Sequence, residues 1–403
     1  MLRFIPKGLP TNQASRRRRP ASDWRYAAFL RIKIPWAGSL CHISAHQVGP
    51  QRMRRHRIAA LGGDGIGAEV VEAGLEVLRV LSGRCGDLDL EVQSFDWSSE
   101  RYLRTGRYIP EGGLEQLRQK DAIYFGAVGS PQVPDHISLW ELRLAIAQGF
   151  DQYANVRPAR LLAGVTGPLA GAPPIDWVIV RENSEGEYAG HGGRAHRGLP
   201  IEVATDTAIF TRAGVERIQR FAFALARRRP RKRLTLVTKS NALRFGLVLW
   251  DEVFHELACE FSDVQVDREL VDACAARMVR RPESLDVLVA TNLYADILSD
   301  LAAALCGSLG IAPTANLNPE RAFPSMFEPI HGSGWDIAGQ GIANPIGAFW
   351  SGALMLEHLG EHAAAARLLA AIEVVTRAGI HTPDLGGSAR TVDVTRAVCQ
   401  ALG

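Results

Sequence analysis

Short, almost continuously apolar runs that alternate with helical stretches constrain the fold of this chain most strongly. The run at 121–128 reads Asp-Ala-Ile-Tyr-Phe-Gly-Ala-Val, and those at 175–181 and 286–290 are similarly apolar. Strands with apolar residues on both sides are typical of a sheet covered by helices on both faces. The pattern therefore predicts an α/β fold. Further strands are expected at 57–61, 90–95 and 233–238, and helices at 112–119, 211–228, 245–260, 270–280, 345–360, 362–378 and 388–401.

A glycine-rich turn follows the first expected strand. It reads Gly62-Gly-Asp-Gly-Ile-Gly67, and the residues after it are apolar at helical spacing up to Leu81. Strand, glycine turn and helix form a βα unit. The turn does not have the spacing of the dinucleotide-binding motif GxGxxG, so we favour a structural turn over a nucleotide site from this motif alone.

Length and composition allow a large core. The chain has 403 residues, 47% of them apolar, which is enough for two domains or one large α/β domain. No apolar run is long enough to span a bilayer, so no membrane association is expected. Six cysteines are scattered without a CxxC pair, which is typical of reduced thiols in a cytoplasmic protein rather than a disulfide framework or a zinc site.

The charge is distributed unevenly. Residues 1–57 hold 13 of the 46 basic residues but one of the 43 acidic ones, so 33 basic and 42 acidic residues remain and the body has a net charge of −9. An acidic body gives no reason to expect nucleic-acid binding. Residues 1–52, with Arg16–Arg19, are consistent with a transit peptide or a basic tail for an anionic partner. We favour a third interpretation, in which translation starts at Met53 and residues 1–52 are a non-native or disordered extension outside the fold.

Asp296 and Asp300 are the most informative polar pair. They lie four residues apart in an apolar stretch, so on a helix both carboxylates share one face with Leu293 and Ala303. No basic residue lies within the stretch. Two carboxylates on a poorly solvated face repel each other unless a cation joins them, and oxygen ligands suit Mg²⁺ or Mn²⁺. The alternative is a polar flank on a core helix.

Four further segments carry polar residues of the kind that catalysis uses. The segments are Arg181-Glu-Asn-Ser-Glu-Gly-Glu-Tyr188, Thr238-Lys-Ser-Asn241, Leu270-Val-Asp272 and Glu328-Pro-Ile-His-Gly-Ser333 with the loop up to Asn344. Together with the glycine turn and the Asp296/Asp300 helix, they resemble the signatures of the metal-dependent β-decarboxylating dehydrogenases, the isocitrate/isopropylmalate dehydrogenase family, in the same order along residues 57–403. Residues 133–140 and 149–153 are similar to its tartrate and D-malate dehydrogenase branch.

The resemblance implies a fold and a domain organisation. It implies a two-domain isopropylmalate-dehydrogenase-like fold with a large mixed sheet, which is not a Rossmann fold. Residues 53–152 and 307–403 would form a large domain that holds NAD. Residues 153–306 would form a smaller domain for dimerisation and metal binding, with an arm near 186–200 that clasps the second subunit of a homodimer.

The resemblance also implies site residues for the oxidation of a 2-hydroxy diacid such as tartrate or D-malate. Asp296 and Asp300 would bind Mg²⁺ or Mn²⁺, with Asp272 reaching over from the second subunit. Lys239, also from the second subunit, would take the hydroxyl proton, and Tyr188 would protonate the enolate that remains if CO₂ leaves. Arg157 and Arg181 would hold the β-carboxylate, because the guanidinium fork suits a carboxylate.

The cofactor implied by the resemblance is NAD. Asp336, after the His331-Gly332-Ser333 loop, would bind the ribose hydroxyls and disfavour a 2′-phosphate. His331 and Asn344 would contact the adenine end.

One position departs from the family pattern. The family carries an arginine ten positions before Arg157, where this chain has Ala147. Arg143 lies one helical turn earlier and is a possible replacement with a shifted register. Two alternatives stay open: a 3-isopropylmalate dehydrogenase, and a catalytically impaired paralogue that lacks one arm of the carboxylate clamp.

Overall fold

The computed structural model describes residues 53–403. The predictions about the N-terminal extension, including Arg16–Arg19, concern residues 1–52 and therefore lie outside the described residues. No helix in the described part is both long enough and apolar enough to cross a membrane.

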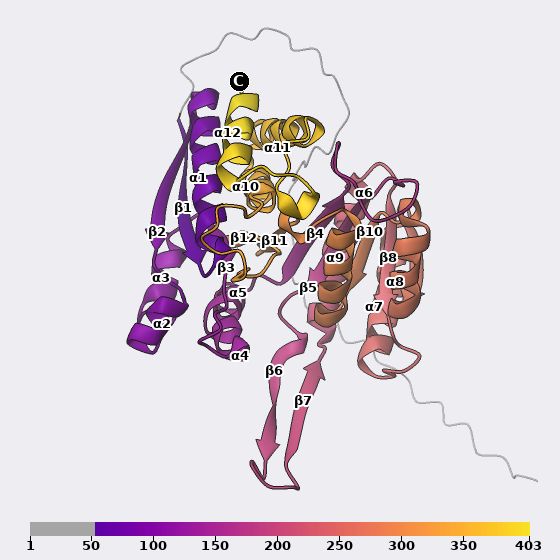
Figure 1. Cartoon of the computed structure of the whole chain (residues 1–403). Helices are drawn as coiled ribbons and strands as arrows, with labels where there is room; N and C mark the ends of the chain where they lie inside the picture. Colours follow the sequence, from indigo (N-terminus) through magenta and orange to yellow (C-terminus); the bar gives the residue numbers. More distant parts are fainter. Residues whose placement is uncertain (1–52) are drawn as a thin grey trace, which may run out of the picture. The chain divides into compact units, whose positions relative to one another are not determined.

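A ten-stranded mixed sheet organises the described chain (Figure 1). Both halves of the sheet are parallel, whereas β12, β11, β4 and β5 pair antiparallel at its centre. The predicted α/β fold with a large mixed sheet is therefore confirmed. The strands lie side by side in the order β2 (Leu88–Phe95), β1 (Arg54–Gly63), β3 (Ala122–Ala127), β12 (Ser325–Pro329), β11 (Pro313–Leu317), β4 (Ala154–Arg160), β5 (Asp176–Glu182), β10 (Val287–Ala290), β8 (Arg233–Thr238) and β9 (Gln265–Leu270).

Helices follow the strands much as the sequence pattern predicts. Six of the seven ranges expected from periodicity alone match a helix to within about two residues at each end; at the seventh, the helix starts three residues later than expected. The helices are α1 (Ile66–Cys85), α2 (Ser99–Thr105), α3 (Gly113–Arg118), α4 (Asp135–Ser138), α5 (Ala145–Gly149), α6 (Arg212–Arg228), α7 (Gly246–Glu260), α8 (Val271–Arg280), α9 (Asn292–Leu305), α10 (Ile346–Leu359), α11 (His362–Arg377) and α12 (Thr391–Ala401), with a π-helical turn η1 (Leu139–Leu144) between α4 and α5.

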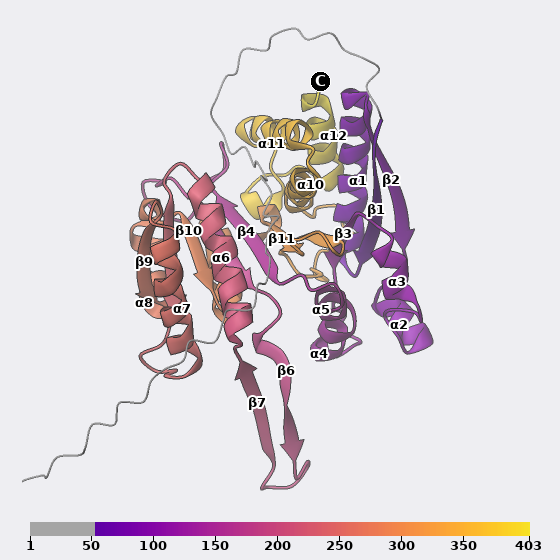
Figure 2. The same cartoon turned by 180° about the vertical axis from the view of Figure 1, so that it is seen from behind.

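Successive side chains along each strand point to opposite faces of the sheet and pack into apolar clusters on both faces. On β10, Leu288 packs into one cluster together with α1, α9 and α10, whereas Val287 and Val289 pack into a second with α6 and α7. A third cluster joins Leu61 and Phe125 of β1 and β3 to Ile146 of α5. Figure 2 shows α6 and α7 over the face that they cover. Burial on both faces explains why these strands are apolar throughout.

The region 306–347, expected as a loop rich in glycine and proline, contains two central strands. Both β11 and β12 are buried, and they link the two parallel halves of the sheet. Their five residues each include Pro313, Asn316 and Pro329, which local propensity does not favour in strands. Pairing with β3 and β4, more than 150 residues away in sequence, therefore decides their conformation.

The strands β6 (Gly186–Ala195) and β7 (Val203–Ile209) form a separate antiparallel hairpin. It extends away from the large sheet (Figure 1), and most of its residues are exposed. The division into a domain of 53–152 plus 307–403 and one of 153–306 stays a prediction. In the sheet, its boundary would fall where β11 pairs with β4.

Candidate active site

Five polar side chains predicted from the sequence meet beside the central strands. Arg157 on β4 and Arg181 on β5 lie diagonally on one face of this antiparallel pair, because Arg157 is opposite Ile179 and Arg181 is opposite Asn155. Helix α9 covers that face with Ala295, Leu298 and Ala302 and carries Asp296 and Asp300 beside the arginines. Tyr188 comes from β6, next to α9.

Asp296 is the centre of the cluster. Its Oδ1 accepts from the Arg181 guanidinium and lies 3.0 Å from Nη1 of Arg157, and its Oδ2 accepts from the Tyr188 hydroxyl at 3.2 Å. Asp300 is less engaged: its Oδ1 lies 3.7 Å from Arg157 Nη1. The Arg181 guanidinium also lies 5.3 Å from the centre of the Tyr188 ring. The structure therefore brings together Arg157, Arg181, Tyr188, Asp296 and Asp300.

The electrostatics of this cluster correct one step of the sequence argument. The absence of a basic residue within 292–305 suggested that only a bound cation could neutralise the two aspartates. In the structure, burial opposes ionisation of Asp296, but the charges of Arg181 and Arg157 outweigh it and hold the pKa of Asp296 below its usual value. The neutralising cations come from strands far away in sequence, which a helical pattern cannot reveal.

The pKa values of the neighbouring groups shift in directions that suit catalysis. Burial and then the negative charge of Asp296 raise the pKa of Tyr188, so its hydroxyl stays protonated at neutral pH. Burial, together with the like charge of Asp296, raises the pKa of Asp300 despite Arg157. Burial, followed by the positive charge of Arg143 on Arg157 and of Arg157 on Arg181, lowers the pKa of these two arginines, although a guanidinium remains charged at any physiological pH.

The two aspartates fit one half of a metal site. The side chain of Asp300 is 54% exposed and makes no hydrogen bond to another described residue, so its oxygens are free to bind a cation. Carboxylate oxygens are the ligands that Mg²⁺ and Mn²⁺ prefer. No group of three or more acidic, histidine or cysteine side chains that could hold a metal is found within residues 53–403 of one chain.

Lys239 and Asp272 form a second pair, separate from the first cluster. Lys239 follows β8 and Asp272 begins α8, and Lys239 Nζ donates to Asp272 Oδ1 at 2.7 Å. This hydrogen bond lowers the pKa of Asp272. No hydrogen bond or ion pair joins Lys239 or Asp272 to Asp296 or Asp300 within the chain. Within one chain, the structure thus brings Lys239 and Asp272 together, but not at the cluster around Asp296.

The predicted cofactor loop closes over the glycine turn. Ile66 N donates to Ser333 O at 2.8 Å, and Trp335 Nε1 donates to Gly129 O at 2.6 Å. A Cβ at Gly65, whose φ is +55°, would lie 1.8 Å from Ser333 O, and one at Gly63 would lie 1.8 Å from Ala127 O. Glycine is therefore required at both positions for this close approach.

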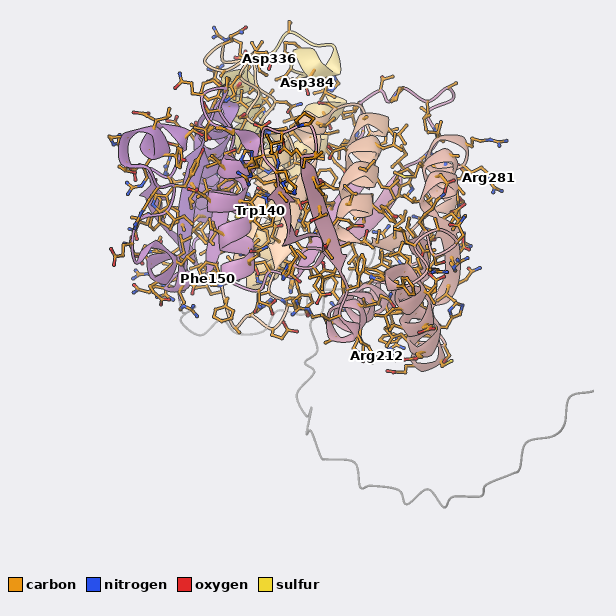
Figure 3. All side chains as sticks on the ribbon, turned by 90° about the horizontal axis from the view of Figure 1, so that it is seen from below. Trp140, Phe150, Arg212, Arg281, Asp336 and Asp384 are labelled. Carbon is orange, nitrogen blue, oxygen red and sulfur yellow. The ribbon has the colours of Figure 1, made fainter. Side chains whose placement is uncertain are left out.

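Two of the predicted cofactor residues keep free polar groups. His331 Nε2 is a buried atom without a hydrogen-bond partner among the described residues, and burial lowers the pKa of its ring. Asp336 is exposed, and its carboxylate makes no hydrogen bond to a described residue (Figure 3). Asn344, in contrast, uses its amide internally, donating to Asp384 and accepting from Ile346 N, and Gly332 is exposed. His331 and Asp336 therefore fit an adenosine better than Asn344 does.

Several polar residues of the cluster were not singled out from the sequence. Asn155 and Asn316 are fully buried between the arginines, and Ser299 accepts from Arg157 Nη1 at 2.6 Å. Glu328 lies in one of the segments described from the sequence, although no function was predicted for it. Asn155 and Asn316 lie on central strands, and a buried asparagine there indicates a polar network, since buried polar groups need partners.

Comparison with known proteins shows the family of this chain. The sequence model of the family described as Isocitrate/isopropylmalate dehydrogenase matches residues 57–401. The chain belongs to this family.

This chain aligns with nearly the whole length of several members of the family. The probable tartrate dehydrogenase/decarboxylase of Agrobacterium vitis is 64% identical over 352 residues, covering 87% of this chain and 98% of the relative. The D-malate dehydrogenase [decarboxylating] of Escherichia coli (strain K12) is 50% identical, covering 87% and 99%. The crystal structure of isocitrate dehydrogenase from Methylococcus capsulatus superposes with a TM-score of 0.78 at 37% identity, covering 86% and 99%. The resemblance and the enzyme class predicted from the sequence, an oxidoreductase, are confirmed.

Proposed function

We propose that this chain is an NAD- and divalent-metal-dependent dehydrogenase that oxidises a 2-hydroxy diacid such as D-malate or tartrate, with decarboxylation. The observation that carries the proposal is the cluster around Asp296, in which two buried arginines, a protonated tyrosine and a free carboxylate face one another. Relatives named for tartrate and D-malate dehydrogenase support the choice of substrate.

The side chains suit the steps that such a reaction needs. Arg157 and Arg181 offer guanidinium groups to a substrate carboxylate. Tyr188, whose raised pKa keeps it protonated, donates a proton to the carbon that loses CO₂. Asp296 and Asp300 hold the metal, which when bound supplies Lewis-acid stabilisation of negative charge on the substrate oxygen.

A second subunit completes the site in this proposal. Lys239 and Asp272 lie apart from Asp296 in one chain but adjacent to each other, so a partner chain delivers them together. Lys239 then takes the proton from the substrate hydroxyl and Asp272 adds a third carboxylate. The exposed β6–β7 hairpin provides the arm of a homodimer, because a two-stranded hairpin with exposed Leu199, Ile201 and Val203 is marginally stable alone.

NAD is the proposed cofactor. The free carboxylate of Asp336 suits the two hydroxyls of an adenosine ribose and repels a 2′-phosphate, and His331 Nε2 offers the partner that the adenine end needs. We place the reaction in the cytoplasm, as the scattered cysteine positions predict.

The test is the formation of NADH by purified protein with Mn²⁺ or Mg²⁺, with D-malate, the tartrate isomers, 3-isopropylmalate and isocitrate in turn. Turnover of D-malate or tartrate with NAD⁺, lost on chelation of the metal and much slower with NADP⁺, is expected. Preference for 3-isopropylmalate, or no turnover of any diacid, would contradict the proposal.

A further inference from the structure

An open cavity of about 440 Å³ lies at the edge of the large sheet opposite the glycine turn. Its wall is formed at the amino-terminal ends of β1, β3 and β12 and at the carboxyl end of α10. The glycine turn lies at the other end of β1, so about 25 Å of strand separates it from Arg55 in the wall. None of the residues that we propose for the substrate, the metal or NAD lines this cavity. The cavity is therefore distinct from the candidate active site.

The wall of the cavity carries more positive than negative charge. Arg57 donates to both oxygens of Asp121, at 2.9 and 3.3 Å, so these two wall residues neutralise each other. Behind the wall, Arg54 and His56 bond to the two oxygens of Glu361. Four further cations remain in the wall, and Asp121 is its one carboxylate. These cations are Arg55, Arg118, Lys120 and Arg321.

Two of the four cations have carboxylate partners outside the wall. Arg55 Nε lies 2.8 Å from Asp89, and Arg118 Nε lies 3.2 Å from Glu115. All of these side chains are exposed, and exposed ion pairs contribute little. The Arg118 guanidinium also lies over the ring of Phe323, 4.7 Å from its centre, which orients it at the wall. The terminal nitrogens of Arg55 and Arg118 make no hydrogen bond to a residue within 53–403.

Lys120 and Arg321 have no partner for their charge. No ion pair or side-chain hydrogen bond joins either of them to another described residue. Partial burial lowers the pKa of Arg321, and no carboxylate counteracts it. Burial and then the charge of Arg321 lower the pKa of the neighbouring His358 to about 3, so this ring is neutral. A cation that is partly removed from water without a counterion is unfavourable, and a bound anion would relieve this cost.

The turn between β11 and β12 fixes Arg321 in the wall. Its φ is +57°, a left-handed conformation that residues with a side chain rarely adopt. The buried Asn318 holds this turn, because its main-chain oxygen accepts from Arg321 N at 2.9 Å and its Oδ1 accepts from Ala322 N at 2.8 Å. Strained backbone of this kind occurs often where a chain binds a ligand.

The size and chemistry of the cavity indicate the class of ligand. A volume of about 440 Å³ is in the range of sites for small organic molecules and exceeds that of a single phosphate ion. Guanidinium and ammonium groups are the usual partners of phosphate oxygens. Phe323, Pro324 and Leu359 give the wall an apolar side as well. The ligand should therefore combine several linked phosphates with a less polar part.

We propose that this cavity binds a nucleoside di- or triphosphate. Lys120 and Arg321 hold the phosphate chain, Arg55 and Arg118 add donors from the rim, and the nucleoside lies against the apolar side. This binding goes beyond the proposed oxidation of a diacid, which uses neither this edge of the sheet nor these residues.

Calorimetric titration of the full chain with ATP tests the proposal. Magnesium-free buffer leaves the phosphates uncomplexed, and excess NADH occupies the proposed cofactor loop around Asp336. ATP should bind wild-type protein with a Kd below about 1 mM. Lys120→Gln with Arg321→Gln should weaken ATP at least about tenfold, because charge-assisted hydrogen bonds are lost. The thermal midpoint should not fall in this variant, since neither cation has a partner in the folded chain.

Two control variants separate this cavity from general attraction of a polyanion. Arg280→Gln with Arg281→Gln, at exposed arginines where α8 ends, removes the same charge and should change ATP binding by less than about twofold. Lys120→Arg with Arg321→Lys keeps both charges and should retain binding. Equal losses in the two glutamine variants, unchanged affinity without Lys120 and Arg321, or no binding of ATP to wild-type protein would overturn the proposal.

Inorganic tripolyphosphate distinguishes the two sources of a phosphate chain. It should bind several-fold more weakly than ATP, because it has no nucleoside for the apolar side. Equal affinity would refute the nucleoside part of the proposal. These titrations need no turnover, so a protein that oxidises no diacid would refute the proposed function and leave the test of this cavity intact.

Discussion

Asp296 and Asp300 differ in environment although they lie one turn apart on the same helix. Asp296 is held ionised by Arg157 and Arg181 and accepts from Tyr188, whereas Asp300 is more exposed and has a raised pKa. At the scale of single residues, one carboxylate therefore organises the arginines and the tyrosine, and the other is left available for a metal. The two identical side chains therefore differ in pKa and in hydrogen bonding because their neighbours differ.

Replacement of Tyr188 by phenylalanine tests the proton donor. We expect kcat to fall by about 10²- to 10⁴-fold, because the hydroxyl is removed while the ring under the Arg181 guanidinium remains. Steady-state kinetics with D-malate, together with an unchanged thermal midpoint, provide the measurement. An unchanged kcat would exclude Tyr188 as the donor.

Glu357 of α10 gives a pH prediction that is independent of the active site. Burial raises its pKa from 4.5 to about 7, so the folded state binds a proton that the unfolded state has lost between these pH values. The free energy of unfolding should therefore fall as pH rises from about 4.5 to 7. Glu357→Gln cannot ionise, and it should be more stable than wild type by about 1–3 kcal/mol at pH 8, with a smaller difference near pH 5. Denaturant unfolding at the two pH values is the measurement, and a gap that does not grow with pH would contradict the assignment.

At the scale of elements, the β6–β7 hairpin and the η1–α5 segment matter most. The ring of Trp140 on η1 packs so closely against the hairpin that a Cβ at Gly190 would lie 2.6 Å from it (Figure 3). The base of the hairpin is thereby anchored to the segment that carries Arg143, while its tip exposes Leu199, Ile201 and Val203.

Charges at the tip of the hairpin should prevent dimerisation. Ile201→Asp with Val203→Asp would bury two carboxylates at the proposed interface, so we expect monomers in sedimentation experiments and loss of activity, because Lys239 and Asp272 would no longer reach a partner. Val374→Asp with Val392→Asp, at exposed valines of α11 and α12, is the matched control. A double variant of the hairpin that remains dimeric would exclude this arm as the contact.

At the scale of the whole molecule, the site needs two chains in our proposal, and subunit mixing tests it. Asp272→Asn and Asp300→Asn should each be inactive alone. When they are co-expressed, random pairing yields heterodimers in half of the molecules, each with one intact site, so about a quarter of the wild-type activity is expected. Activity that stays absent in the mixture would show that Asp272 acts within its own chain.

The sequence by itself determined the family, the α/β class and most helices, and it predicted the residues that we propose for metal binding and catalysis. Apolar spacing and short motifs are local, and they specify helices such as α9 and the face that Asp296 and Asp300 share. The tertiary structure alone decided that β11 and β12 are central strands and that Arg157 and Arg181 neutralise Asp296. These outcomes depend on partners up to 203 positions apart, such as Ser325 and Ala122, whose pairing no local pattern encodes.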